Sequence, residues 1–252
     1  MFDLTDRVAL VLGGTGLYGA PLSEALAESG AHVIVASRDV NRCEEAVGKL
    51  RQRGLLADYE QFDQGDAQSI IGLKERFFSK WDKLDVLVNS SVARPMHCYE
   101  DDISAWRQSM EVNATGLFAI CRAFLDPMME CSSGSIINIG SIQGVVAPDF
   151  SNYAGTNMTT PPDYQFHKHG LIGLTKYLAA LAGPRGVRVN VISPGGYSPD
   201  AEEPFISQYC HRVFLGRMAE PNDIKGAVVF LASEASRYIT GANIVVDGGY
   251  SC

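Results

Sequence analysis

Three glycines follow the first apolar segment of the chain and could hold phosphate groups. Gly13, Gly16 and Gly19 stand three residues apart, between the apolar run 7–13 and a segment of helical spacing at 17–29. Glycine permits a tight turn and a close approach of backbone N–H groups to a pyrophosphate, and the start of the next helix adds partial positive charge. Glycine is common in this chain, so an ordinary glycine-rich turn is the alternative. The strand–turn–helix context favours nucleotide binding.

The end of the second apolar segment bears on which nucleotide is bound. The segment 32–37 ends in Ser37, which Arg38 follows, and Asp39 comes one position later than a carboxylate that would grip a ribose 2′-hydroxyl. A hydroxyl and a fixed cation suit a 2′-phosphate. We therefore expect NADP in preference to NAD, with a solvated surface charge as the other interpretation of Arg38.

Short apolar segments alternate with segments of helical spacing along the whole chain. The pattern predicts seven strands, at 7–13, 32–37, 55–63, 84–89, 135–141, 187–193 and 243–246. It predicts helices between them, at 17–29, 40–53, 66–80, 101–131, 161–182 and 221–232. Right-handed crossovers then give an α/β fold, a doubly wound parallel sheet with helices on both faces, in a single domain over 1–252. Two irregular windows, 142–160 and 194–220, follow strand ends, where such sheets bind ligands.

Composition and charge exclude several classes of protein. The 252 residues are 46% hydrophobic and 20% charged, which excludes a disordered, collagen-like or small disulfide-rich chain. The net charge of −8 repels phosphate backbones, so we expect no nucleic-acid partner. No run approaches the ~20 apolar residues that span a bilayer and the first residues lack a secretory pattern, so we expect no membrane partner. Six cysteines without a CxxC pair predict reduced thiols in the cytoplasm and no metal site.

Six later segments, taken with the glycine loop, resemble the short-chain dehydrogenase/reductase family. They are LDVLVNSSVA (84–93), MEVNATGLF (110–118), SIINIGSIQG (135–144), YQFHKHGLIGLTKYLA (164–179), VRVNVISPGGY (187–197) and ITGANIVVDGGYS (239–251). The resemblance follows the family's order over nearly the whole chain. It implies a Rossmann-type sheet of about seven strands, an NADP- or NAD-dependent oxidoreductase with a small-molecule substrate, and a homo-oligomer, either a tetramer or a dimer.

The resemblance also implies a catalytic set. In that family an Asn, a Ser, a Tyr and a Lys do the chemistry, and these roles carry over onto Asn113, Ser141, Tyr164 and Lys168. Lys168 lies one helical turn after Tyr164, so its charge favours the tyrosinate and brings the phenol closer to the working range of a base. Ser141 is expected to hold the substrate oxygen, and Asn113 a water molecule behind Lys168. Each of the four residues alone has an ordinary structural reading, but the ordered set favours catalysis.

The resemblance further implies which residues contact the cofactor. Besides Tyr164 and Lys168, these are Gly13, Thr15, Gly16, Leu17, Tyr18, Gly19, Ser37, Arg38, Asp63, Gln64, Asn89, Ser90, Ser91, Pro194 and Gly195. Several positions depart from the family pattern, because Leu17 and Val92 stand where glycine is usual and Leu12 where threonine is common. A sensor or scaffold that binds NADP without turnover is therefore one alternative to an enzyme.

The spacing between Ser141 and the catalytic tyrosine is unusual for the family. Tyr164 lies 23 residues after Ser141, roughly twice the usual separation, whereas Tyr153 lies 12 residues after it. The residue four positions after Tyr153 is the uncharged Asn157, whereas Tyr164 is followed at that distance by Lys168. We therefore assign the catalytic role to Tyr164.

The sequence before Tyr164 predicts a helix start. Thr160 can cap this helix, with Pro161 in its first position and Asp163 as the partner of Thr160. Residues 145–160 then form an insertion beside the active site. This insertion resembles a branch of the family found in bacterial surface-sugar and flagellin-glycan pathways, which implies a polar, sugar-like substrate. The candidate substrate contacts are Gln143, Asn152, Tyr153, Asn157 and Tyr197.

The second irregular window, at about 195–218, is expected to form a lid over the substrate. Arg212 and Arg217 in this lid could bind a substrate anion, although solvated surface charges are the simpler interpretation. The expected reaction is hydride transfer between the nicotinamide and a carbonyl or alcohol of the substrate, with Tyr164 as acid and base. A 3-oxoacyl thioester reductase is a second alternative, but the basic patch it needs for an acidic carrier fits poorly with a net charge of −8.

Overall fold

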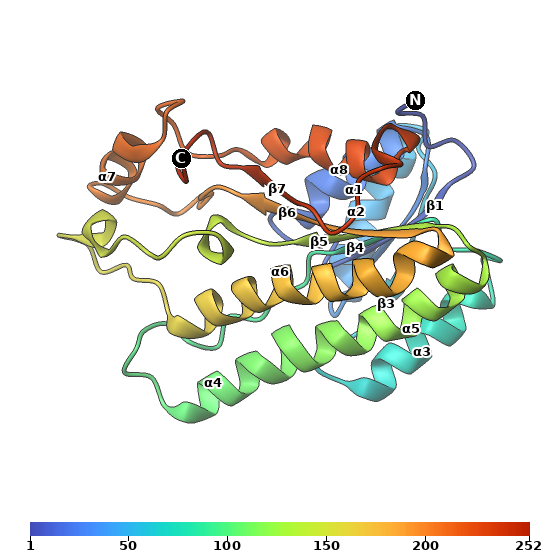
Figure 1. Cartoon of the computed structure of the whole chain (residues 1–252), viewed down its shortest axis with the longest axis horizontal. Coiled ribbons are helices and arrows are strands. Elements are labelled where there is room, and N and C mark those ends of the chain that lie inside the picture. Colours follow the sequence, from blue (N-terminus) through green and yellow to red (C-terminus); the bar gives the residue numbers. More distant parts are fainter.

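A computed structural model describes residues 1–252, and its centre is one parallel sheet of seven strands (Figure 1). The strands are β1 (Val8–Leu12), β2 (His32–Ser37), β3 (Ala57–Gln61), β4 (Val86–Asn89), β5 (Gly134–Ile139), β6 (Val187–Pro194) and β7 (Asn243–Val246). Their order across the sheet is β3-β2-β1-β4-β5-β6-β7, and all neighbours are parallel. All seven predicted strands are present, each within a few residues of its predicted bounds.

Helices cover both faces of the sheet (Figure 1). One face carries α1 (Gly19–Glu28), α2 (Val40–Gln52) and α8 (Lys225–Ala232). The other carries α3 (Ala67–Phe78), α4 (Ile103–Met110), α5 (Leu117–Glu130) and α6 (Pro162–Ala182). Each face has its own core of 23 buried residues. The predicted doubly wound α/β fold is confirmed.

The strand sequences explain why the middle of the sheet is buried. β1 reads VALVL and β2 reads HVIVAS, and such continuous aliphatic runs suit strands that helices cover on both faces. The edge strand β3 instead reads ADYEQ and carries polar side chains. The chain order reverses between β1 and β4, because β2 and β3 lie on one side of β1 and all later strands on the other. Ligands of such sheets bind at the carboxyl ends of the strands beside this reversal.

The predicted helix 101–131 is divided in the structure. A π-helical turn, Glu111–Gly116, separates α4 from α5, and turns of this kind are frequent at functional sites. A Cβ atom on Gly116 would lie 2.1 Å from the carbonyl oxygen of Gln64, so the turn packs directly on the segment after β3. The Gln64 amide also donates to the Val112 carbonyl at 2.8 Å. The interruption depends on this distant segment, so helical periodicity does not reveal it.

The two irregular windows form one lobe at the carboxyl ends of β5 and β6 (left in Figure 1). The second window contains a helix that the sequence did not predict, α7 (Phe205–Arg212), and the first contains a 3-10 turn, Phe150–Tyr153. The Gln208 amide of α7 donates to the Ala154 carbonyl of the insertion at 3.0 Å. The lobe has its own small core, which consists of Ile142, Phe205, Tyr209, Val213 and Tyr250.

α6 begins one residue later than predicted. Pro162 takes its first position, Pro161 precedes it, and no side chain caps the helix. The Thr160 hydroxyl donates to Oε1 of Gln143 at 2.7 Å, so the side chain expected to cap α6 ties the insertion to the loop after β5 instead. Tyr164 still lies in the first turn, as predicted. None of the helices has the length and apolarity needed to cross a bilayer.

Candidate active site

Two backbone segments approach each other closely at the reversal between β1 and β4. Gly13, after the end of β1, has a φ of +71°, and a Cβ atom there would lie 2.7 Å from the backbone nitrogen of Ser91. A Cβ atom on Gly19 would lie 2.0 Å from the carbonyl oxygen of Gly13. Only glycine fits these two positions, so they determine the tight turn into α1. The turn brings the first N–H groups of α1 to the carboxyl end of the sheet, where a pyrophosphate is favoured.

Two adjoining cavities run along this end of the sheet. The smaller, of about 230 Å³, is lined by eight predicted cofactor residues: Gly13, Thr15, Ser37, Arg38, Asp63, Gln64, Ser90 and Ser91. The larger, of about 450 Å³, is lined by seven: Leu17, Tyr18, Ser90, Tyr164, Lys168, Pro194 and Gly195. Both cavities include Ser90 and Val92, so together they connect the end of β2 with α6. The residues present therefore fit an extended dinucleotide, with its adenosine toward Arg38 and its nicotinamide toward Tyr164.

The end of β2 carries unbalanced positive charge. Arg38 is exposed and has no ion pair, and Asp39 is used as the N-cap of α2, where its carboxylate accepts from the Arg42 backbone N–H at 3.2 Å. The Arg42 guanidinium donates to the Thr15 carbonyl at 2.9 Å, which brings a second cation to the glycine turn. Arg42 was not predicted, although it follows Arg38 by four residues. This arrangement suits an added phosphate on the adenosine ribose.

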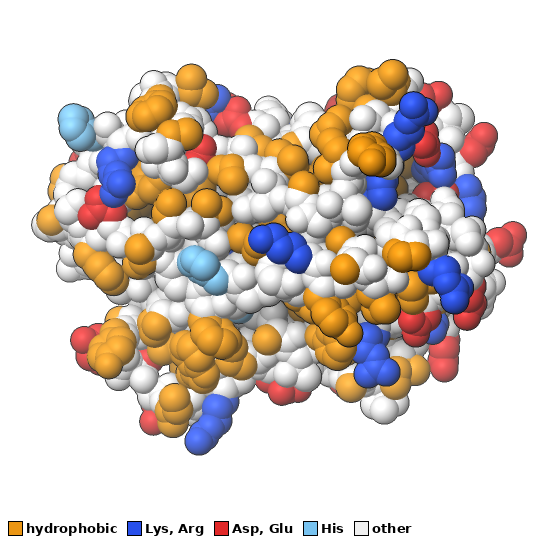
Figure 2. Space-filling view, in the orientation of Figure 1, with side chains coloured by type: hydrophobic (Ala, Val, Ile, Leu, Met, Phe, Trp, Pro, Cys, Tyr) orange, Lys and Arg blue, Asp and Glu red, His pale blue; other side chains and the backbone are white.

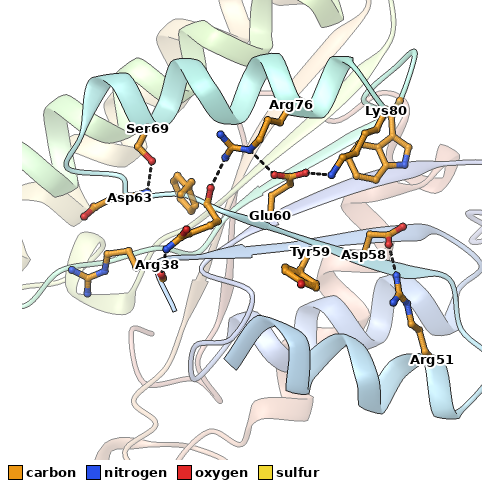
Figure 3. A pocket seen from close by; sticks show the side chains of 12 residues that line it. Arg38, Arg51, Asp58, Tyr59, Glu60, Asp63, Ser69, Arg76 and Lys80 are labelled. Atoms are coloured by element: carbon orange, nitrogen blue, oxygen red, sulfur yellow. Dashed lines mark hydrogen bonds and ion pairs between the residues drawn. The ribbon is translucent and has the colours of Figure 1, made fainter. Parts of the chain in front are cut away.

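Figure 3 shows that two acidic groups of β3, Asp58 and Glu60, are neutralised by neighbouring cations. The groove over the edge strand holds two sets of ion pairs, Glu60 with Arg76 and Lys80, and Asp58 with Arg51. Arg38 points away from these groups at the other end of the groove. Asp58 and Glu60 are therefore not free to neutralise Arg38, and Asp63, which lines this groove and the smaller cavity, accepts from the Gly65 N–H at 2.9 Å.

Three of the four predicted catalytic residues lie together at the larger cavity. Ser141 follows β5, Tyr164 stands in the first turn of α6, and Lys168 is one turn further along. Lys168 is buried, donates to the Ile139 carbonyl at 2.7 Å, and places its ammonium nitrogen 5.5 Å from the centre of the Tyr164 ring. The ends of β5 and α6 thus bring an alcohol, a phenol and a cation into one cavity.

The surroundings of Tyr164 and Lys168 adjust the acidity of both groups. Burial opposes ionisation of Tyr164, but the cations of Lys168 and Arg94 outweigh it, with help from Ser141, so the pKa of the phenol lies below its ordinary value. The pKa of Lys168 is lowered too, because burial and Arg94 disfavour its charged form more than Tyr164 favours it. A phenol held in this way exchanges a proton closer to neutral pH than a free one does.

Arg94 belongs to the same cavity and was missed by the sequence reasoning. It lies in the loop after β4, is exposed, and places its guanidinium carbon 4.9 Å from the centre of the Tyr164 ring. It makes no ion pair with any carboxylate of the chain. Arg94 and Tyr164 are too far apart along the chain for sequence spacing to predict their contact. The position of Arg94 just after a predicted strand end is the one feature that indicates a place near the ligand.

Asn113, the fourth predicted catalytic residue, lies in the π-helical turn and does not line the cavity. Its amide donates to the Ala93 carbonyl at 2.8 Å and to the Ser109 hydroxyl at 3.0 Å, and its oxygen accepts from the Ala93 N–H at 2.9 Å. Ser109 in turn donates to Asp163 in the first turn of α6. The side chain of Asn113 therefore clamps the loop that carries Arg94 and connects it to α6. The predicted contact with a water molecule stays a prediction.

Three of the predicted substrate contacts line the larger cavity: Gln143, Tyr153 and Tyr197. Asn157 does not line it and is exposed to solvent on the insertion. Asn152 is buried, and its amide donates to the Tyr250 hydroxyl at 2.7 Å, so it joins the insertion to the C-terminal segment. Neither asparagine lines the cavity, so a substrate contact of either one stays a prediction.

Tyr153 differs from Tyr164 in its surroundings. Its ring packs 5.3 Å from the Phe205 ring, between centres, and burial raises its pKa. No lysine or arginine lies over its ring, whereas both Lys168 and Arg94 lie near Tyr164. The geometry therefore favours Tyr164 for proton transfer, in agreement with the prediction from the sequence.

The lid is attached to the glycine turn and to the rest of the lobe. The Tyr18 hydroxyl donates to the Gly195 carbonyl at 3.1 Å. Both lid arginines bind carboxylates of the protein itself: Arg212 pairs with Asp149, and Arg217 with Asp223. Because these cations are neutralised, their interpretation as surface charges holds and neither is free for a substrate anion.

Three predicted cofactor residues line neither cavity: Gly16, Gly19 and Asn89. Gly19 shapes the turn instead, and Asn89 is buried in the sheet, where its amide donates to Oδ1 of Asn138 at 2.7 Å. Val92 has no positive φ, so the loss of glycine at that position costs no backbone strain. This departure from the family pattern therefore gives no support to an inactive scaffold.

Comparisons with known proteins agree with this geometry. Residues 18–251 match the family model described as enoyl-(acyl carrier protein) reductase. The chain is 33% identical to cis-4-hydroxycyclohexanecarboxylate dehydrogenase of Sinomonas cyclohexanicum, over 98% of this chain and 97% of that protein. It is also 33% identical to D-threitol dehydrogenase of Mycolicibacterium smegmatis, over 99% of this chain and 95% of that protein.

A solved structure shares the same architecture. The gluconate 5-dehydrogenase of Burkholderia cenocepacia J2315, in complex with NADP and tartrate, superposes with a TM-score of 0.91 at 27% identity, over 99% of this chain and 97% of that one. The matches extend over almost the entire chain, and the TM-score shows that the fold is shared. The chain therefore belongs to the short-chain dehydrogenase/reductase family, and it is an NAD(P)-dependent oxidoreductase that acts on a small molecule.

Proposed function

We propose that this protein uses NADP to interconvert a secondary alcohol and the corresponding ketone in a polar, polyol-like substrate. The observation that carries the proposal is the convergence of Ser141, Tyr164 and Lys168 on one cavity, which adjoins the cavity beside the glycine turn. NADP, when bound, accepts or supplies the hydride. The unpaired Arg38 and the nearby Arg42 support NADP over NAD.

Tyr164 exchanges a proton with the substrate oxygen. In the oxidative direction its ionised hydroxyl takes the proton of the alcohol while the C–H bond breaks, and in the reductive direction it returns that proton to the carbonyl oxygen. Lys168 favours the ionised phenol by its charge. Ser141 donates a hydrogen bond to the substrate oxygen, on which negative charge develops.

The substrate class is inferred from the cavity and from the relatives. Gln143, Tyr153 and Tyr197 offer hydrogen-bonding groups for hydroxyls. Similar proteins are named for a tetritol and for a cyclic hydroxy acid. The insertion 145–160, which resembles that of the surface-sugar branch, supports a sugar-like substrate. A 3-oxoacyl thioester reductase is the alternative.

A paired substitution tests the proposal. Purified protein is assayed with NADP(H) against polyols, sugar acids and 3-oxoacyl thioesters. Tyr164→Phe is expected to lower kcat by ~10²–10⁴-fold, the usual contribution of a general acid or base. Tyr153→Phe serves as the matched control and is expected to keep most of the activity. Turnover of thioesters alone would favour the alternative, and a larger loss in Tyr153→Phe than in Tyr164→Phe would reverse the assignment.

We also propose a homo-tetramer in the cytoplasm. Apolar side chains gather over α4, α5 and α6 (Figure 2), and exposed ones on these helices include Ile103, Phe118, Phe166, Tyr177 and Leu181. Such a face supports burial against a second copy. All six cysteines are unpaired, which supports a reducing compartment. Light scattering is expected to give a mass well above the 27.3 kDa of one chain, and a monomer would contradict the tetramer.

A further inference from the structure

Arg94 is a cation at the substrate cavity that pairs with no carboxylate of the chain and whose one neighbouring group is the phenol of Tyr164. Lys168, the other lysine or arginine of the lining, donates to the Ile139 carbonyl. Arg212 and Arg217, which lie in the nearby lid, are paired with carboxylates. A guanidinium that lines a cavity and pairs with no carboxylate of the protein is available to bind an anion.

The cavity has no carboxylate to balance Arg94. The only acidic residue of its lining is Asp163, which is 1% exposed and accepts the Ser109 hydroxyl. While Tyr164 is protonated, Arg94 and Lys168 therefore outweigh Asp163 in the lining, although the chain as a whole has a net charge of −8. A cavity of this kind concentrates anions locally, because its walls focus the field of the few charges inside.

Arg94 is also held in a defined place. Both backbone groups of the preceding residue, Ala93, are bonded to the buried side chain of Asn113. The guanidinium carbon lies 4.9 Å from the centre of the Tyr164 ring. Tyr164 must contact the reacting oxygen of the substrate. One small molecule could therefore place its anionic group at the Arg94 guanidinium and its reacting oxygen at Tyr164.

We propose that Arg94 binds an ionised carboxylate of the substrate, so that the substrate is a small hydroxy acid or oxo acid and not a neutral polyol. The inference rests on the proposed function and narrows its substrate class. The planar fork of arginine matches the two oxygens of a carboxylate. A phosphate monoester, with its higher charge, calls for a second unpaired cation, and the lining of the cavity offers none.

Matched pairs of substrates test this proposal. Each pair shares one carbon skeleton and differs in a carboxylate or a hydroxymethyl group: D-gluconate with D-sorbitol, and cis-4-hydroxycyclohexanecarboxylate with cis-4-(hydroxymethyl)cyclohexanol. The oxidation of each by NADP is measured as kcat/KM at several pH values, for the wild type, Arg94→Gln, Arg94→Lys and Arg212→Gln. Arg212→Gln is the control, because it removes an arginine from the same end of the molecule that is already paired.

The wild type is expected to prefer the acid of at least one pair. Arg94→Gln is expected to lower kcat/KM for that acid by ~10-fold more than for its neutral twin, the low end for hydrogen bonds to a charged group because Arg94 is exposed. Arg94→Lys recovers part of the preference, and Arg212→Gln leaves it intact. A role of Arg94 confined to the acidity of Tyr164 would instead lower both members of a pair alike and shift their pH profiles together.

The results distinguish a failure of the carboxylate site from a failure of the proposed function. Equal use of acid and neutral twin by the wild type, or an equal loss of both in Arg94→Gln, overturns the carboxylate site and leaves the proposed function in place. Turnover of phosphate monoesters in preference to carboxylates overturns it as well. If the wild type, tested with NADP(H), oxidises no alcohol and reduces no carbonyl in either set, the proposed function fails and this inference fails with it.

Discussion

Replacing Asn113 by alanine removes two hydrogen bonds to the loop after β4 and one to Ser109 of α4. The side chain is 5% exposed and bonds to the N–H and carbonyl of Ala93 and to the Ser109 hydroxyl. The variant leaves both backbone groups of Ala93 without these partners, whereas the Ser109 hydroxyl keeps its bond to Asp163. Alanine also suits a helix. The variant therefore tests whether the clamp between the π-helical turn and this loop positions the active site.

The expected loss of stability depends on how deeply the two backbone groups of Ala93 are buried. A buried polar group without a partner costs ~1–3 kcal/mol. Ala93 is only half-buried, so water can reach its backbone groups in part, and we expect a total loss of ~2–4 kcal/mol in the free energy of unfolding. For a chain of this length that corresponds to a fall in Tm of roughly 4–16 °C.

Asn190 in β6 supplies a matched control, because its buried side chain also bonds to backbone groups of a neighbouring segment. It is fully buried, its amide donates to the Ile239 carbonyl at 2.9 Å, and its oxygen accepts from the Ala242 N–H at 3.0 Å. Asn190→Ala is therefore expected to lose a similar amount of stability without touching the loop that carries Arg94. Urea denaturation at one fixed protein concentration measures the stability of both variants and removes differences due to assembly.

Activity distinguishes the two variants. At a temperature where both are folded, Asn113→Ala is expected to lose ~10–10²-fold in kcat/KM, since a displacement of about 1 Å at an active site has effects of this order. Asn190→Ala is expected to stay close to the wild type. The reasoning is refuted if both variants lose activity alike, or if Asn113→Ala loses less than ~0.5 kcal/mol of stability.

Three further substitutions test the electrostatics and the backbone. Lys168→Met removes a cation that favours the phenolate of Tyr164, so the pKa of Tyr164 rises and the pH at which alcohol oxidation reaches half its plateau moves upward; an unchanged pH–rate profile would contradict this. Arg38→Gln is expected to weaken NADP binding at least ~10-fold in calorimetric titrations, with little change for NAD, whereas equal losses would exclude a 2′-phosphate contact. Val92→Gly is expected to lower the free energy of unfolding by ~0.5–1 kcal/mol in urea, because it adds freedom to the unfolded chain without relieving strain; a gain would reveal strain at this position.

The order of elements and the location of the ligand edge could be predicted from the sequence. Strands such as β1 and β2 are nearly continuous apolar runs because helices cover them on both sides, and that pattern is visible in any short window. The glycine turn is local as well, since Gly13 and Gly19 meet within one strand–turn–helix unit. Tyr164 and Lys168 could be paired on the sequence because one helical turn separates them.

The parts that escaped prediction depend on contacts between distant segments. α7 is only eight residues long, and it lies against the insertion, with which it shares a small core. The π-helical turn arises where Gly116 meets Gln64, and an isolated helix pattern contains no sign of that contact. Helix propensity and periodicity describe one element at a time, so they cannot anticipate what its neighbours impose.

The chemistry of individual side chains was decided in the same way by tertiary structure. Asn157 has the right residue type for a substrate contact, yet its place on the insertion leaves it in solvent. Arg212 and Arg94 are the same residue type, but a carboxylate neutralises the first and nothing neutralises the second. Local sequence determines which groups are present and which element carries them. Only the folded chain determines which of them are paired, buried or free, because the free energy of a charge depends on neighbours that are remote in sequence.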